Sequence, residues 1–236
     1  MNRHGVRNLE LVVSAISALG DLAHEVVLVG GAATALLITD PAAPDVRPTL
    51  DVDVVVEVLS RREHYEFCER LRDKGFVESG EEGVICRWKK GGVILDVMPT
   101  NEDILGFANR WYPDTVRNAQ RVEVDGKPFW AVTGPYFLAT KWEAFQARGA
   151  GDYLSSHDLE DIIAVIDGRA GIVDEINASE EVLREYLAEC ARLLLEKDAA
   201  EPVLSWHMPG DQASQQRARF VREKLRAISA YGVIPN

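Results

Sequence analysis

Three aspartates lie within apolar stretches of the sequence, where an ionised side chain requires a partner. Asp51 and Asp53 alternate with the aliphatic residues of segment 50–56, and Asp96 lies inside the apolar segment 93–98. Side chains two apart on a strand project from one face, so Asp51 and Asp53 are expected side by side. Adjacent carboxylates repel one another unless a cation lies between them, and their hard oxygen atoms favour Mg²⁺ or Mn²⁺. The spacing therefore predicts a metal site made by these three aspartates.

A glycine pair precedes the aspartates and offers a place for phosphate groups. The apolar run 26–29 ends at Gly30 and Gly31, and a helix-prone segment, 32–38, follows at once. Such a pattern is typical of a buried strand, a tight turn and the start of a helix. Glycines let a phosphate approach the backbone, and the free N–H groups at a helix start attract its charge. A phosphate cradle followed by paired carboxylates is what metal-assisted nucleotidyl transfer requires.

Taken in order, these motifs resemble those of a known superfamily. The glycine pair, the Asp51-x-Asp53 pair and Asp96 are similar to the motifs of the nucleotidyltransferases, which share the polymerase-β-like fold. Segment 47–53, Arg-x-Thr-x-Asp-x-Asp, resembles a subgroup that includes the AbiEii-type toxins and related uncharacterised nucleotidyltransferases. The gap between the glycines and Asp51 is longer than in many members, and three prolines indicate a loop there.

The resemblance implies a metal-dependent enzyme that transfers a nucleoside monophosphate from an NTP to an acceptor hydroxyl and releases pyrophosphate. It assigns the catalytic and metal-binding roles to Asp51, Asp53 and Asp96, with Asp96 as a candidate acceptor of the hydroxyl proton. The residues assigned to nucleotide binding are Gly30, Gly31, Thr34, Arg47, Thr49, Lys141 and Asp158. The sequence does not choose between ATP and the other NTPs, and RNA, a small molecule or a protein are all candidate acceptors.

Lys141 and Asp158 belong to a second pair of motifs. Segments 138–142 and 157–162 resemble the later motifs of AbiEii-like proteins, in which a lysine precedes an arginine and an Asp-Leu-x-Asp-Leu sequence, although three positions differ here. Lys141 can equally be a solvated helix lysine, and Asp158 a first-turn acid that complements the helix dipole. In either role Lys141→Ala is expected to change the free energy of unfolding by only about half a kcal/mol.

Composition limits the classes of function. The chain has 236 residues, of which 47% are hydrophobic and 27% charged, as in ordinary globular proteins. Its formal net charge of −12 makes it a poor non-specific binder of nucleic acids, so an RNA partner needs a local basic patch. Five basic residues within 217–226 offer one, although a solvated helix face is the simpler interpretation. No apolar run reaches the length of a membrane span, and three widely spaced cysteines indicate free thiols and a cytoplasmic location.

The apolar periodicity predicts an α/β (α+β) protein with a small mixed sheet and a helical C-terminal part. The resemblance implies that the sheet forms the nucleotidyltransferase core and that the helical part closes the nucleotide cleft. We expect the core over 1–133 and the mainly helical region over 134–236. Strands are expected over 25–29, 50–58, 84–89, 93–98, 121–124 and 129–132. Helices are expected over 6–19, 31–38, 60–74, 101–108, 136–148, 156–166, 180–197 and 212–230, with a linker over 201–211.

Other functions are compatible with parts of the pattern. A catalytically silent nucleotide-binding or antitoxin-like subunit would keep the fold, but it has no need for all three aspartates. A nuclease or phosphohydrolase would use the carboxylates, but the glycine turn favours transfer. A toxin would act together with an antitoxin protein as its partner. If repulsion among the carboxylates dominates without metal, Asp96→Asn should leave the melting temperature unchanged or raise it.

Overall fold

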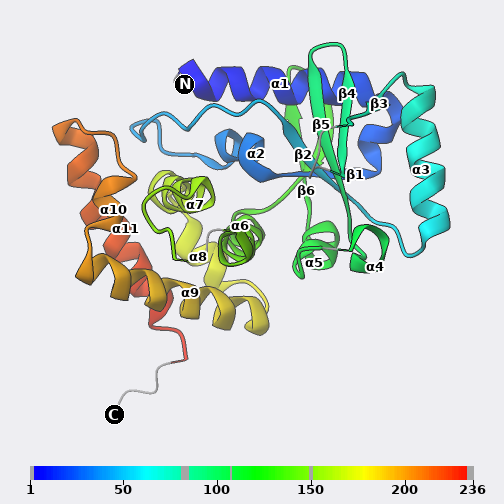
Figure 1. Ribbon diagram of the computed structural model, residues 1–236. Coiled ribbons are helices and arrows are strands. Elements are labelled where there is room, and N and C mark those ends of the chain that lie inside the picture. Colours follow the sequence, from blue (N-terminus) through cyan, green and yellow to red (C-terminus); the bar gives the residue numbers. More distant parts are fainter. Residues whose placement is uncertain (1–2, 81–84, 107, 149–150, 233–236) are drawn as a thin grey trace. The chain divides into compact units, whose positions relative to one another are not determined.

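The computed structural model describes residues 3–80, 85–106, 108–148 and 151–232. Their contacts divide the chain into two compact units. The sheet unit consists of Arg3–Ala35 and Arg47–Thr133, and the helical unit contains Leu36–Val46 and the chain from Gly134 onward. The strands all lie in the first unit, so the fold separates a sheet-based part from an all-helical part, as Figure 1 shows.

The sheet unit is built on seven strands in the order β3-β4-β5-β2-β1-β7-β6. The strands are β1 (Val26–Val29), β2 (Val52–Val56), β3 (Val77–Glu78), β4 (Arg87–Lys90), β5 (Val93–Pro99), β6 (Gln120–Val124) and β7 (Lys127–Ala131). Strand β1 pairs parallel with β7, β2 pairs parallel with β5, and the other neighbours are antiparallel. The predicted mixed sheet is therefore confirmed, and Val84, the first residue of one expected strand, lies outside the described residues.

Two hairpins in this sheet follow from glycine turns. Gly91 (φ 57°) lies in the turn between β4 and β5, and Asp125 (φ 50°) and Gly126 (φ 73°) connect β6 to β7. Positive φ at both residues of a two-residue turn gives the twist that a β-hairpin needs, which explains the Asp-Gly sequence. Each turn fixes the register of its strands, and the β4–β5 register determines which residue lies opposite Asp96.

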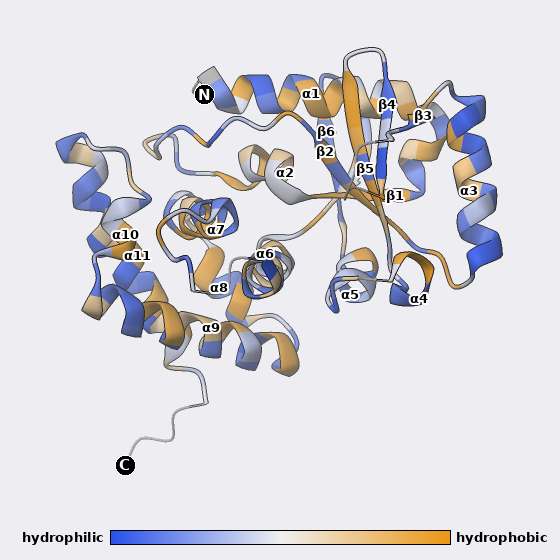
Figure 2. Ribbon diagram, viewed as in Figure 1, coloured by the Kyte–Doolittle hydropathy of each residue, from blue (hydrophilic) through white to orange (hydrophobic). Residues whose placement is uncertain are grey.

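Helices of the sheet unit pack on its strands. They are α1 (Arg3–Leu19), a 3₁₀ turn (Gly20–His24), α2 (Gly30–Leu37), α3 (Arg61–Asp73), α4 (Glu102–Leu105) and α5 (Tyr112–Arg117). Helix α1 packs on β2, β5 and β7. Figure 2 shows the central strands as apolar and the outer side of α3 as polar. Ser60 caps the start of α3: its Oγ accepts the N–H of Glu63 at 3.2 Å, while Glu63 accepts the N–H of Leu59, the residue before the cap, at 2.7 Å.

The helical unit contains α6 (Gly134–Arg148), α7 (His157–Gly168), α8 (Ile172–Asn177), α9 (Glu181–Ala200), α10 (Val203–Trp206) and α11 (Gln212–Ser229). Its core forms where α6 packs on α7 and α9, and where α11 packs on α9 and α7. The linker expected over 201–211 contains the short helix α10, whose Val203 and Leu204 are fully buried. No helix among the described residues combines the length and apolar content needed to cross a membrane.

Segment Leu36–Val46 joins the helical unit through backbone contacts. The N–H groups of Thr39 and Asp40 both donate to the carbonyl oxygen of Gly168, each at 2.9 Å. Arg217 of α11 donates to Asp40 Oδ2 at 2.6 Å and to Asp167 Oδ2 at 2.7 Å. Arg169 also donates to the carbonyl of Leu37 at 3.1 Å, so the segment is held by groups that lie far along the chain.

Candidate active site

The sheet brings the three predicted aspartates together. In the parallel pair β2–β5, Asp53 lies directly opposite Asp96, and in the antiparallel pair β1–β2, Asp53 lies opposite Val29. Asp51 comes one residue before β2. Asp96 is buried, with a side chain 11% exposed, whereas the side chain of Asp51 is 32% exposed. The three carboxylates therefore gather at the start of β2 and the middle of β5.

Arg87 of β4 supplies the positive charge that these carboxylates need. Its Nε donates to Asp96 Oδ1 at 2.8 Å, and its Nη2 donates to Asp96 Oδ2 at 2.7 Å and to Asp51 Oδ2 at 2.8 Å. The β4–β5 register places Arg87 opposite Asp96. We call Asp51, Asp53, Asp96 and Arg87 the carboxylate cluster. Arg87 was not among the residues predicted from the sequence.

The position of Arg87 reverses one expectation. Repulsion among the aspartates predicts that Asp96→Asn leaves stability unchanged or raises it, but the fork of Arg87 holds both oxygens of Asp96. A charge-assisted, two-pronged pair of this kind is attractive, and removing one partner leaves the other buried without compensation. Asp96→Asn is therefore expected to destabilise the metal-free protein.

Gly30 allows one of the carboxylates to lie against the backbone. This residue has φ 66°, and a Cβ built on it would fall 1.9 Å from Asp53 Oδ2. A side chain at position 30 is thus excluded twice, by the left-handed backbone and by the carboxylate. The predicted glycine turn is present, since β1 ends at Val29 and α2 begins at Gly30. Gly30 thus leaves room for the Asp53 side chain and also leaves the backbone open.

The segment before β2 is fastened by a side-chain amide of α1. Asn8 is fully buried; its Nδ2 donates to the carbonyl of Arg47 at 2.9 Å, and its Oδ1 accepts the N–H of Thr49 at 3.2 Å. Thr49 Oγ1 then donates to Asp51 Oδ1 at 2.8 Å. Asn8 and Thr49 thereby orient Asp51, and Asn8 is a second positioning residue that the sequence motifs do not reveal.

Two other predicted nucleotide-binding residues lie near the glycine turn. Gly31 is in the first turn of α2, and Thr34 is one turn further along the same helix. The Thr34 side chain is buried, and its Oγ1 has no hydrogen-bond partner among the described residues. A nucleotide role for either residue stays a prediction.

The atoms of the carboxylate cluster are of the kind that a hard divalent cation prefers, but their arrangement is not that of a metal site. Carboxylate oxygens from adjacent strands are the ligands that Mg²⁺ prefers. The negative potential of the cluster also acts on its neighbour Cys86: burial, followed by the charges of Asp96 and Asp53, raises the pKa of this thiol to about 11. Across the described ranges, no three His, Cys, Asp or Glu side chains are oriented to hold a metal ion, and Arg87 occupies oxygens of two of the three carboxylates.

Lys141 and Asp158 lie in the helical unit and pair with each other. Lys141 Nζ donates to Asp158 Oδ1 at 3.0 Å and lies 2.7 Å from Asp161 Oδ2, and Arg148 donates to Asp158 Oδ2 at 2.8 Å. Lys141 is only 7% exposed, so the interpretation as a solvated helix lysine is wrong. Burial alone would raise the pKa of Asp158, but the charges of Lys141 and Arg148 outweigh it and lower that pKa. We call these four residues the lysine cluster.

The basic residues of α11 are largely used within the helical unit. Arg217 binds Asp40 and Asp167, and Arg222 Nε donates to Asp198 Oδ2 at 2.8 Å. Lys224 Nζ donates to the carbonyls of Ile166, Asp167 and Arg169, which cap the end of α7. Three of the five basic side chains therefore hold helices together, which weakens the interpretation of α11 as a nucleic-acid platform.

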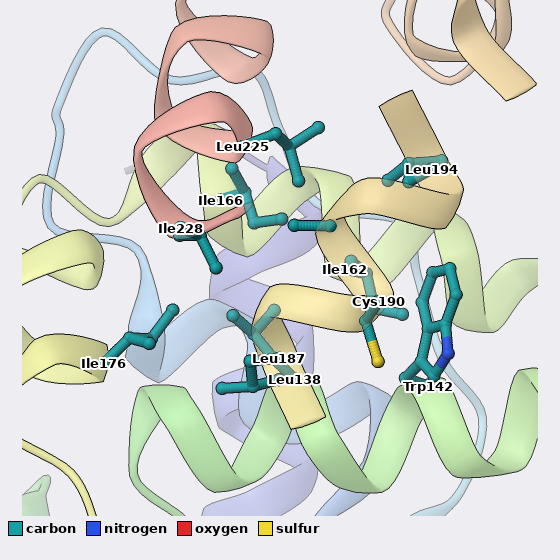
Figure 3. A pocket seen from close by; sticks show the side chains of 11 residues that line it. Leu138, Trp142, Ile162, Ile166, Ile176, Leu187, Cys190, Leu194, Leu225 and Ile228 are labelled. Atoms are coloured by element: carbon teal, nitrogen blue, oxygen red, sulfur yellow. The ribbon is translucent and has the colours of Figure 1, made fainter. Parts of the chain in front are cut away.

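Two hollows contain none of the predicted site residues. A groove of about 700 Å³ lies in the sheet unit at the opposite ends of β1 and β2, beside Val26, Val56 and the half-exposed Trp130. A void of about 20 Å³ lies inside the helical unit and is shown in Figure 3. The void is lined by apolar side chains from α6, α7, α8, α9 and α11 and by Cys190, so it has too few polar groups to hold an ordered water.

One solved structure supports the fold. An antigenic nucleotidyltransferase-like protein from Paracoccidioides brasiliensis matches with a TM-score of 0.52 and 22% sequence identity, over 84% of this chain and 92% of that chain. Neither a family model nor a curated protein matches the sequence. At this identity the likeness shows the fold alone: the chain has a nucleotidyltransferase-like fold, with a mixed sheet flanked by helices.

Proposed function

We propose that the chain is a metal-dependent nucleotidyltransferase, which transfers a nucleoside monophosphate from an NTP to an acceptor hydroxyl. The observation that carries this proposal is the register of Asp53 opposite Asp96, with Asp51 beside them and Gly30 against Asp53. The nucleotidyltransferase-like fold supports it independently. Asp51, Asp53 and Asp96 would hold Mg²⁺ or Mn²⁺, and Gly30 and Gly31 would leave the backbone open to phosphates.

The reaction follows from these roles. The hydroxyl oxygen of the acceptor attacks the α-phosphorus, a new P–O bond forms, and the bond from the α-phosphorus to the bridging oxygen breaks. Pyrophosphate leaves with that electron pair, and the carboxylate of Asp96 accepts the hydroxyl proton. Bound Mg²⁺ would neutralise the triphosphate and favour the ionised hydroxyl. Thr49 keeps Asp51 in place through its hydrogen bond.

The specific form of the proposal is a toxin of the AbiEii type that acts on RNA and is neutralised by an antitoxin protein in the cytoplasm. It rests on the sequence resemblance of segments 47–53, 138–142 and 157–162. Expression of the chain in a bacterial host should arrest growth, and Asp53→Asn should restore it. Normal growth with the wild-type chain at high expression would reject the toxin role and leave the transferase role standing.

Transfer itself is tested with α-labelled NTPs, one at a time, in the presence of fractionated cell extract. We expect label in one acceptor fraction with Mg²⁺, and none with EDTA or with Asp53→Asn. Asp73→Asn, an exposed acid at the end of α3, is the matched control and should transfer as the wild type does. Equal transfer by Asp53→Asn and wild type would overturn the assignment of the catalytic residues.

A catalytically silent nucleotide-binding subunit is the second candidate. The observation that favours it is Arg87, because a guanidinium bound to Asp51 and Asp96 balances carboxylates without any metal. This candidate predicts NTP binding that is independent of Mg²⁺ and no labelled acceptor in any extract fraction. Calorimetry with each NTP, with and without Mg²⁺, separates the two candidates.

A further inference from the structure

Arg87 holds the oxygens that a metal ion would need. Both oxygens of Asp96 accept from its guanidinium, at 2.8 and 2.7 Å, and Asp51 Oδ2 accepts from the same Nη2 at 2.8 Å. The remaining oxygen of Asp51 accepts from Thr49. All four oxygens of these two carboxylates therefore have a donor within hydrogen-bond distance. The Arg87 side chain is 19% exposed, so it is enclosed but reaches solvent.

A guanidinium and a divalent cation cannot both occupy this position at low cost. A cation bound to Asp96 would lie within a few ångströms of the guanidinium, where like charges in a partly buried site repel strongly. The guanidinium fork, however, fits phosphate oxygens as well as carboxylate oxygens. An incoming triphosphate thus offers Arg87 an equivalent partner when a metal takes its place on the carboxylates.

We propose that Arg87 is an internal counter-ion, which neutralises Asp51 and Asp96 before the metal binds and is transferred to the triphosphate when metal and nucleotide bind together. This inference rests on the proposed function and identifies a residue and a coupling that the nucleotidyltransferase motifs do not contain. It makes metal and nucleotide binding cooperative: the metal alone must displace Arg87, and the nucleotide provides the displaced guanidinium with a new partner.

If binding is cooperative in this way, removing Arg87 should change the metal affinity and the nucleotide affinity in opposite directions. Without its guanidinium the carboxylates are open, so the metal alone should bind more tightly. The triphosphate loses one contact, so the nucleotide should bind less tightly at saturating metal. A coupling between two ligands is reciprocal and commonly amounts to between 5- and 150-fold, so each effect should be about tenfold. A merely structural arginine would weaken both or change neither.

The experiment measures Mn²⁺ binding alone by electron paramagnetic resonance, and ATP binding by calorimetry at saturating Mg²⁺. Arg87→Gln should bind Mn²⁺ about tenfold more tightly than wild type and ATP about tenfold more weakly, with the other NTPs as substitutes if ATP does not bind. Arg72→Gln is the matched control, since Arg72 also bridges two carboxylates, Glu69 and Glu78, in the same unit. It should match wild type in both titrations.

Melting curves test the proposal even if Arg87→Gln folds poorly. Without metal, Arg87→Gln should melt below wild type, and Mn²⁺ should raise its melting temperature more than that of wild type. Arg87→Lys keeps the charge but loses the fork, so it should fall between the two in Mn²⁺ affinity. Weaker or unchanged Mn²⁺ binding by both variants overturns the counter-ion role.

The two proposals fail in different ways. If wild type binds ATP only with metal, but Arg87→Gln leaves both affinities unchanged, the counter-ion is rejected and the proposed function stands. If the wild-type protein binds no NTP in a metal-dependent way, the proposed function is rejected. In that case the transfer of Arg87 to a triphosphate is rejected with it, because no metal-bound nucleotide is present to receive the guanidinium.

Discussion

The two units each contain a cluster of charged side chains, and the clusters differ in composition. The carboxylate cluster of the sheet unit has three aspartates and one arginine, whereas the lysine cluster of the helical unit has two aspartates, one lysine and one arginine. The first is rich in negative charge and lies partly open, since Asp51 is 32% exposed. The second is balanced, and its Asp161 is 1% exposed. The two clusters therefore differ in net charge as well as in the exposure of their aspartates.

A charge-balanced cluster needs no ligand, even though its Arg148 side chain is 71% exposed, and a cluster with more acids than bases attracts cations. The carboxylate cluster should therefore respond to divalent metal, and the lysine cluster should not. This contrast also bears on the predicted role of Lys141 in nucleotide binding, because Lys141 would have to leave Asp158 and Asp161 to reach a phosphate. The following predictions test the contrast, beginning with the largest effect.

Lys141→Met should lower the free energy of unfolding by about 3–5 kcal/mol, because it leaves Asp158 and Asp161 buried without their shared cation. Added Mg²⁺ should not restore the loss. Urea unfolding followed by circular dichroism measures both. Lys197→Met, at an exposed lysine of α9, is the control and should change stability by less than about 0.5 kcal/mol. If Lys141→Met also lowered the free energy of unfolding by less than about 0.5 kcal/mol, the lysine cluster would not be structural.

Asp96→Asn should lower the free energy of unfolding in EDTA by about 1.5–3 kcal/mol, since it removes a charge-assisted partner of Arg87. The exposed acid Asp73 again provides the control, as Asp73→Asn. Mg²⁺ should raise the melting temperature of the wild-type protein but not that of Asp96→Asn. A more stable Asp96→Asn protein would show that repulsion among the carboxylates outweighs their attraction to Arg87.

Acid should weaken the lysine cluster through Asp158. The pKa of this carboxyl is lowered in the folded protein, so its stabilising contribution is fully present above its unfolded pKa of about 3.9. The contribution is lost as the pH falls through the lower, folded pKa. Below about pH 4, the free energy of unfolding should therefore fall less steeply with falling pH for Asp158→Asn than for wild type. The difference between the two slopes corresponds to at most one proton. An unchanged slope between pH 4 and pH 2 would contradict this.

Thr49→Val should have the smallest effect, a loss of about 0.5–1.5 kcal/mol in the free energy of unfolding, because one hydrogen bond to Asp51 disappears. Thr49→Val should weaken Mn²⁺ binding by more than this small loss of stability suggests, since Asp51 loses its orientation. Thr49→Ser keeps the hydroxyl and should behave as wild type does. Equal Mn²⁺ binding by Thr49→Val and Thr49→Ser would remove Thr49 from the positioning of Asp51.

Local signals in the sequence were sufficient for most of the sheet. The Asp125-Gly126 turn lies between the strands expected over 121–124 and 129–132, and the Ser60 cap lies at the start of the helix expected over 60–74. Helices α5 and α8, with six residues each, were missed because fewer than two turns give no readable periodicity. The attachment of Leu36–Val46 to the helical unit depends on Gly168 and Arg217, which no local pattern connects to it.

Arg87 is missed because the sequence does not fix the length of one turn. The strands expected over 84–89 and 93–98 leave three residues between them, and counting outward from that turn pairs Arg87 with Leu95. In the structure the turn has two residues, so Lys90 pairs with Val93 and Arg87 with Asp96. The burial of Lys141 depends on how α6 meets α7, which the sequence does not reveal either. A hairpin is thus predictable from a local pattern, but its register and the contacts between packed helices are not.

The attachment of Leu36–Val46 has a consequence for the order in which the protein folds. Asp40 is made early, but Arg217, which binds it, follows 177 residues later. At a synthesis rate of 5–20 residues per second, the loop waits roughly 9 to 35 s on the ribosome for this partner. The two segments of the helical unit are therefore synthesised at different times, as well as being separate in the sequence. A nascent chain that stops before α7 lacks Gly168 as well as Arg217 and should expose this loop to proteases, whereas the released full-length chain should protect it.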